Sequence, residues 1–93
     1  MEFEKTNNGF VKHDENGKII AEITYATTSD PNVVVADHTF VDSSLRGQGV
    51  AGKLLNVLVE DMKQQNKKIK ASCSYVVKKF EEDSSYDFIN ADK

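Results

Sequence analysis

The sequence is poor in the residues that build small disulfide-bonded or metal-bound scaffolds. Its 93 residues contain a single cysteine, Cys73, so no intrachain disulfide can form. A free thiol without a disulfide framework is typical of a reducing compartment, and we expect a cytoplasmic protein. Cys73 and the two distant histidines, His13 and His38, do not make a ligand set for zinc, so we expect no metal.

Long apolar runs and clusters of positive charge are also missing. No segment approaches the roughly 18 apolar residues of a membrane span, and the N-terminus Met-Glu-Phe-Glu-Lys has no apolar core of a signal peptide. We therefore expect neither membrane association nor a signal peptide. The net charge is −3, and the one basic pair that stands out is Lys67-Lys68. A nucleic-acid-binding protein usually shows a larger basic footprint, so we expect no nucleic-acid partner.

Proline and glycine are scarce, with one and five residues, so their positions mark the turns clearly. Strands are predicted at 9–14, 18–26 and 33–41, and turns between them at 15–18 and 29–32. Consecutive strands on tight turns form an antiparallel meander. The run 33–41 is apolar on both faces, which predicts a central strand covered on both sides.

The hydrophobic period changes after the third strand. From 49 to 66 apolar residues recur every three or four positions, which predicts an amphipathic helix with one buried face. Residues 68–73 predict a short strand, and 74–83 predict a second helix. A strand–helix–strand unit with a full-length crossover helix makes its strands parallel, so we predict that 33–41 and 68–73 are parallel and joined right-handedly.

These elements predict a single α+β domain over residues 1–93. Its sheet is mixed, an antiparallel three-strand meander plus one parallel strand, and it carries two helices. The tail 84–93 is polar, and we expect it to dock through Tyr86, Phe88 and Ile89. We expect a monomer or a weak homodimer.

Three of the five glycines, Gly47, Gly49 and Gly52, lie between the third strand and the long helix. Glycine inside a helix costs about 1 kcal/mol relative to alanine, so this placement indicates a backbone requirement. No Ser, Thr, Asp or Asn directly precedes the helix to cap it, which leaves the first-turn N–H groups available to a phosphate or pyrophosphate. Arg46, the single arginine, can add a bidentate contact. The alternative is that the glycines only let the helix pack closely on the sheet.

Two nucleotide-binding motifs do not fit this segment. Gly52-Lys53-Leu54 lacks the hydroxyl residue that the phosphate loop of nucleoside triphosphatases requires. The spacing of Gly47, Gly49 and Gly52 matches the dinucleotide-binding fingerprint, but here it follows an antiparallel meander rather than a parallel sheet.

The segment 46–51, Arg-Gly-Gln-Gly-Val-Ala, instead resembles the Gln/Arg-x-x-Gly-x-Gly/Ala signature of the GCN5-related N-acetyltransferase superfamily. Arg46, Gly49 and Ala51 occupy its three defining positions, and the resemblance extends over about residues 10–83. Two further segments, His38-Thr39 and 73–75 (Cys-Ser-Tyr), resemble those of the very small bacterial members. The resemblance implies a minimal acyl-CoA N-acyltransferase fold that binds acetyl-CoA, or coenzyme A, as co-substrate.

The resemblance also implies where acetyl-CoA binds. The loop amides would bind its pyrophosphate, and the backbone of the preceding strand would pair with its pantetheine arm. The strand 68–73 would splay away and leave a slot for the thioester. The cofactor-binding residues would be Phe40, Val41, Arg46, Gly47, Gln48, Gly49, Val50, Ala51 and Gly52. Typical members are longer, and their extra helices and strands usually form the wall of the acceptor site, so the amine acceptor stays open.

Three residues are candidates for the chemistry, because acetyl transfer to an amine needs a base for the incoming ammonium and an acid for the leaving thiolate. His38 is the candidate base, or else a histidine with a purely structural hydrogen bond. Cys73 is a candidate nucleophile that takes the acetyl group first, or else a small buried hydrophobic residue. Tyr75 is the alternative acid, or else a core aromatic. The acidic run 81–83 is expected to be a solvated face.

Three functions therefore compete. The first is an acetyl-CoA-dependent N-acetyltransferase that acts on an unidentified amine. The second is a coenzyme A-binding module without catalysis, because the parts that usually hold the acceptor are missing. The third is a structural or interaction domain that binds no ligand, in which the glycines serve packing alone.

Overall fold

One five-stranded mixed sheet organises the computed structural model, which describes all 93 residues. The strands are β1 (Glu4–Thr6), β2 (Gly9–His13), β3 (Ile19–Thr27), β4 (Val33–Val41) and β5 (Lys68–Ala71). The helical elements are the 3-10 turns η1 (Ser43–Leu45) and η2 (Ser84–Tyr86) and the α-helices α1 (Val50–Gln64) and α2 (Ser74–Glu82). The strands lie in chain order, and all neighbours are antiparallel except β4 and β5. The predicted α+β class, the meander and the parallel pair are confirmed.

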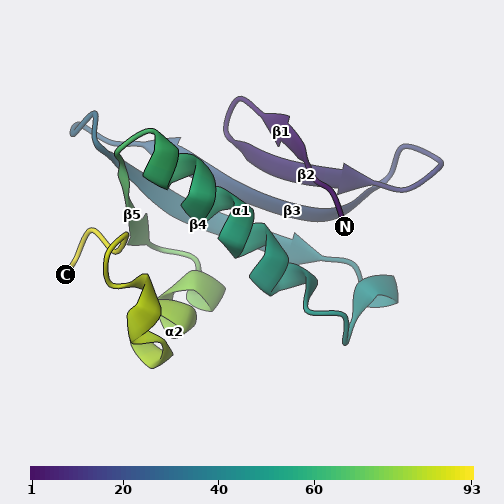
Figure 1. The fold of residues 1–93 in the computed structure, drawn as a ribbon. Coiled ribbons are helices and arrows are strands. Elements are labelled where there is room, and N and C mark those ends of the chain that lie inside the picture. Colours follow the sequence, from purple (N-terminus) through teal and green to yellow (C-terminus); the bar gives the residue numbers. More distant parts are fainter.

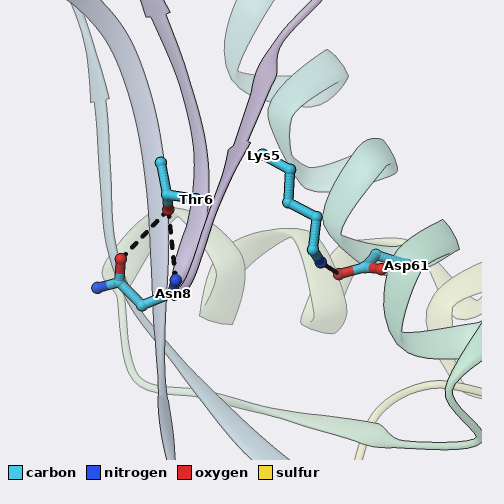
Figure 2. A network of polar contacts seen from close by, with 4 residues as sticks. All are labelled: Lys5, Thr6, Asn8 and Asp61. Carbon is cyan, nitrogen blue, oxygen red and sulfur yellow. Dashed lines mark hydrogen bonds and ion pairs between the residues drawn. The ribbon is translucent and has the colours of Figure 1, made fainter.

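Strand β1 is the element that the sequence did not predict. It adds a fifth strand by pairing with β2. The Lys5 ammonium forms an ion pair with Asp61 of α1, which links this edge of the sheet to the helix (Figure 2). The Thr6 hydroxyl accepts the N–H of Asn8 at 3.3 Å and steadies the turn into β2. Three largely polar residues are too few to show a period of two, so no sequence pattern indicated this strand.

Helix α1 lies across one face of the sheet (Figure 1). Its buried side chains recur every three or four residues and are Val50, Leu54, Leu55, Leu58, Val59 and Met62. They pack on the inner side chains of β3 and β4, which include Ala21, Ile23, Val34 and Ala36. The predicted helix is confirmed, one residue shorter at its start and two at its end. Neither α1 nor α2 combines the length and the apolar character that a membrane crossing needs.

The opposite face of the sheet carries no helix, so the expectation that strand 33–41 is covered on both sides was wrong. In β4, Val34 and Ala36 are buried on the α1 side, whereas His38 and Phe40 are exposed. The connection between β2 and β3 is only a turn, in which the Asp14 carboxylate accepts backbone N–H groups. Such a turn cannot cover the sheet. Apolar composition on both faces of β4 therefore did not mean burial on both faces.

The C-terminal tail adds a short parallel pairing beside β5. The N–H of Ile69 donates to the carbonyl of Ile89 at 2.8 Å, and the N–H of Ala91 donates to Ile69 at 2.9 Å. Ile89 is buried, and the Tyr86 ring packs 5.5 Å from the ring of Phe80. Docking by these two residues is confirmed. Docking by Phe88 was wrong, because its side chain is 52% exposed while its neighbour Ile89 takes the inward position.

Candidate functional site

Strands β4 and β5 separate halfway along β4. Their parallel pairing ends at Ala36 and Ala71. The carbonyl of Ala36 accepts two hydrogen bonds there, from the N–H of Ser72 at 3.0 Å and of Cys73 at 2.9 Å. Strand β4 continues well past the end of β5 (Figure 1), and residues 38–41 have no strand on that side. The backbone edge that includes Phe40 and Val41 therefore has no strand partner beyond Ala36, and we call this unpaired edge beside the end of β5 the slot.

A β-bulge lies at the point where the two strands separate. Thr24 of β3 pairs with His38, and the next residue, Tyr25, pairs with Ala36, which leaves Asp37 as the extra residue. The Asp37 carboxylate accepts the Thr24 hydroxyl at 2.6 Å. Because a bulge bends its strand and redirects the side chains that follow, it decides which residues of β4 face the slot from each side.

The side chains after the bulge divide between the two faces. Thr39 pairs with Ile23, a core residue, and so faces the helices. His38 and Phe40 lie on the open face, where the His38 Nε2 is 4.0 Å from a carboxylate oxygen of Glu22. The candidate base His38 therefore approaches the slot from the face opposite to the helices.

Residues 46–49 form an exposed turn that leads into α1, and residues 50–52 form the first turn of the helix. Gly47 and Gly49 adopt left-handed backbone conformations, with φ of 82° and 68°. A Cβ atom at either position would meet no other atom within 4 Å, so close packing does not explain these glycines. A Cβ on Gly52 would lie 3.7 Å from the Tyr75 hydroxyl, which is an ordinary contact. The alternative in which the glycines serve helix packing has no support in this geometry.

Six consecutive backbone N–H groups are free at this turn. The first helical hydrogen bond runs from the N–H of Lys53 to the carbonyl of Gly49, and no N–H from Gly47 to Gly52 donates within the chain. No side chain caps α1 either. Alternating left-handed residues direct amides into a concave anion site, and the helix start adds about half a positive charge. Together with the exposed side chain of Arg46, this turn has the donors to bind a pyrophosphate.

Cys73 lies where the slot opens, at the N-cap position of α2. It is half-buried, and its sulfur is 3.4 Å from the Thr39 hydroxyl. Burial raises the pKa of the thiol, but contacts to Thr39 and to the N–H groups of Val76 and Tyr75 outweigh burial and lower the pKa. Neither N–H group donates a full hydrogen bond to the sulfur. A thiol with a lowered pKa at a helix start is suited to nucleophilic chemistry.

Tyr75 belongs to the same side of the site. Its ring packs against the core, and its hydroxyl lies beside the first turn of α1 at Gly52. Burial, and to a lesser degree the charge of Glu82, raise the pKa of its phenol. The phenol therefore keeps its proton at neutral pH.

The structure brings together most of the predicted site residues. On the helix side of β4, Tyr75 lies beside Gly52 of the loop and Cys73 contacts Thr39, whereas His38 lies on the other face. Thr39 is the residue of this site that was not predicted as a functional residue. Its place in the segment His38-Thr39, which resembles that of the very small bacterial family members, was the available signal. Nowhere do three or more His, Cys, Asp or Glu side chains gather into a metal-binding cluster.

Comparisons with known proteins agree with this geometry. The family model described as GCN5-related N-acetyl-transferase matches residues 9–89. The solution structure of a GCN5-like protein from Staphylococcus aureus is 39% identical, with a TM-score of 0.79, and the match covers 96% of this chain and 86% of that chain. No curated protein matches the chain.

More distant solved structures share the fold over part of their length. Glucosamine-6-phosphate N-acetyltransferase from Arabidopsis thaliana is 26% identical with a TM-score of 0.56, over 78% of this chain and 54% of that chain. The GNAT family N-acetyltransferase YhbS from Escherichia coli, solved in complex with CoA, is 23% identical with a TM-score of 0.56, over 66% of this chain and 37% of that chain. The family match over most of the sequence, together with the open slot and the uncapped helix, shows that this chain belongs to the GCN5-related N-acetyltransferase family.

Proposed function

We propose that this protein transfers the acetyl group of acetyl-CoA to an amine acceptor. Membership of the family supports an acyl-CoA N-acetyltransferase in general. The observation that carries the specific proposal is the run of six free amides from Gly47 to Gly52 at the mouth of the slot between β4 and β5.

Each part of the site has a role in holding acetyl-CoA. The amides of 47–52 and the Arg46 guanidinium bind the pyrophosphate, which carries the negative charge that a helix start favours. The pantetheine arm extends along the free edge of residues 38–41 and hydrogen-bonds to the backbone near Phe40 and Val41. The thioester then lies in the slot beside Cys73.

The position and the lowered pKa of Cys73 favour a covalent route. The Cys73 thiolate attacks the thioester carbonyl, a new carbon–sulfur bond forms, and the bond to coenzyme A breaks. Coenzyme A leaves as a thiolate and takes up a proton. The acceptor amine, deprotonated by His38 from the open face, then attacks acetyl-Cys73 and releases the cysteine. In the direct route the same amine attacks acetyl-CoA itself, and the phenol of Tyr75 supplies the proton to coenzyme A.

Titration with acetyl-CoA and coenzyme A, followed by backbone amide chemical shifts, tests the binding half of the proposal. We expect the shifts to concentrate at 46–52, 39–42 and 72–75. Arg46→Ala should weaken binding and leave the fold unchanged, and Arg46→Lys should weaken it less because one charge is kept. The absence of shifts at millimolar ligand would overturn the proposal.

A coenzyme A-binding module without catalysis is the second candidate. The observation in its favour is the open face of the sheet, where no helix stands beside His38 to form an acceptor wall. Release of free coenzyme A from acetyl-CoA in the presence of amines separates the two functions. Binding without release across a broad set of amines would favour the module.

A further inference from the structure

A second positive charge lies beside the pyrophosphate turn, on α2 rather than on α1. The Tyr75 hydroxyl reaches the first turn of α1 at Gly52, and the Lys79 ammonium lies 6.0 Å from the centre of the Tyr75 ring. Tyr75 and Lys79 are four residues apart and therefore share one side of α2. One aromatic ring thus separates Lys79 from the free amides of α1.

The surroundings of Lys79 leave its charge available. Its one ion-pair partner is Glu82, at 3.7 Å on the same helix. Such an exposed pair is worth little, because water screens both charges. Asp83, also near Lys79, has its carboxylate engaged by Ser85. A multiply charged anion arriving beside Tyr75 can therefore displace Glu82 at small cost.

Coenzyme A carries a third phosphate, on the 3′ position of its ribose, which the pyrophosphate turn leaves without a partner. The ribose is joined directly to the pyrophosphate, so its 3′-phosphate must lie close to the turn. We propose that Lys79 binds this 3′-phosphate and releases Glu82 when it does. The inference rests on the proposed function, and it assigns to α2 the recognition of the nucleotide end of the cofactor.

The test compares coenzyme A with 3′-dephospho-coenzyme A, which keeps the pyrophosphate and the pantetheine arm. Calorimetric titration of the whole chain at low salt should give about two- to five-fold tighter binding of coenzyme A, the range expected of one partly exposed charge pair. Lys79→Gln should abolish this preference by weakening coenzyme A alone. Glu82→Gln should increase the preference, since Lys79 then has no competing partner.

Lys78→Gln is the matched control, because Lys78 is the neighbouring lysine on α2 and its exposed side chain forms no ion pair. It should keep the wild-type preference. Equal affinity of the wild type for both nucleotides would overturn the inference and leave the cofactor site intact. A preference that survives Lys79→Gln would also overturn it. Failure of the wild type to bind either nucleotide would instead overturn the proposed function on which the inference rests.

Discussion

The two short 3-10 turns and the two α-helices begin in different ways. Asp42 accepts the N–H of Ser44 at 3.0 Å and its hydroxyl at 2.6 Å, and so caps η1. Asp83 caps η2 through Ser85 in the same way, at 3.0 and 2.7 Å. Both α-helices begin without a side-chain hydrogen bond. The elements with the most backbone donors to satisfy are thus the ones left uncapped.

The difference indicates what the two α-helix starts are for. A cap stabilises a helix, and the Asp-x-Ser sequence that supplies one occurs twice in this chain. At α1 a left-handed glycine, Gly49, stands in the cap position and leaves the amides free. At α2 a thiol, Cys73, stands there, and the N–H groups lower its pKa. Helix α2 begins directly after β5, and its Tyr75 hydroxyl lies beside Gly52 in the first turn of α1. Both uncapped starts therefore belong to the site for which we propose a ligand and a nucleophile, where function can outweigh the stability that a cap would add.

Replacement of the thiol at α2 should have the largest effect. Under the covalent route, Cys73→Ala removes the nucleophile and lowers kcat/KM by about 1000-fold or more. Mass spectrometry after incubation with acetyl-CoA should find one acetyl group on Cys73 of the wild type. Cys73→Ser keeps the shape of the side chain and serves as the control for packing. Full activity of Cys73→Ala without any adduct would exclude the covalent route and leave direct transfer.

Addition of a cap at α1 should have the next largest effect. Gly49→Asp places a carboxylate among the free amides, where it competes with the pyrophosphate and repels it, and we expect about 100-fold weaker binding of coenzyme A. Gly49→Asn is the matched control, because asparagine also tolerates a positive φ and adds no charge. If the two variants bind coenzyme A equally well, the turn is not the anion site. Calorimetry measures the affinity, and thermal unfolding checks the fold.

Loss of the Thr39 hydroxyl should change the reactivity of Cys73 by a smaller factor. The contact with Thr39 lowers the pKa of the thiol, so Thr39→Val should raise this pKa and reduce the thiolate fraction at neutral pH. Alkylation by iodoacetamide at neutral pH should slow about two- to five-fold, because a smaller fraction of the thiol is ionised. In the wild type the midpoint of the alkylation profile should lie below the 9.0 of an ordinary thiol. Ser72→Ala, at the neighbouring exposed residue, should leave the profile unchanged.

Removal of a cap from a 3-10 turn should have the smallest effect and should depend on pH. Hydrogen bonds from Ser85 lower the pKa of Asp83 below its usual 3.8, so the ionised carboxylate favours the folded state. This contribution is complete above the pKa of the unfolded chain and is lost as the pH falls through the lower pKa of the folded chain. Asp83→Asn should therefore reduce Tm at pH 7, and the reduction should shrink in acid, once the pH falls below the ordinary carboxyl pKa of 3.8.

Two further variants make the cap measurement specific. Asp42→Asn should show the same pH dependence as Asp83→Asn, because the pKa of Asp42 is lowered by the same type of contact to Ser44. Asp87→Asn lies next to η2 without such a contact and should leave Tm unchanged at both pH values. A loss of stability that persists in acid would show that the carboxylate charge is not its source.

Local patterns in the sequence determined most of the fold. The change of hydrophobic period separated the strands from α1, and the crossover length predicted the parallel pair of β4 and β5. The missing cap before α1 and the three glycines predicted an anion site at the loop 46–52, and the structure leaves the amides of this loop free for one. Two features that the sequence predicted wrongly or not at all, Phe88 and strand β1, have local causes as well. Strand β1 is too short to show a pattern, and Phe88 lies beside another apolar residue that takes the buried position.

Only the tertiary structure decided how the chemical groups are arranged. The bulge at Asp37 places Thr39 on the helix side and His38 on the open face, and that register depends on pairing with β3. The contact between Cys73 and Thr39 joins residues 34 positions apart. The position of Tyr75 beside Gly52 likewise depends on how α2 packs against α1. Periodicity and turn chemistry act between neighbours in the sequence, whereas strand register and helix docking are set by the burial of side chains that are distant along the chain.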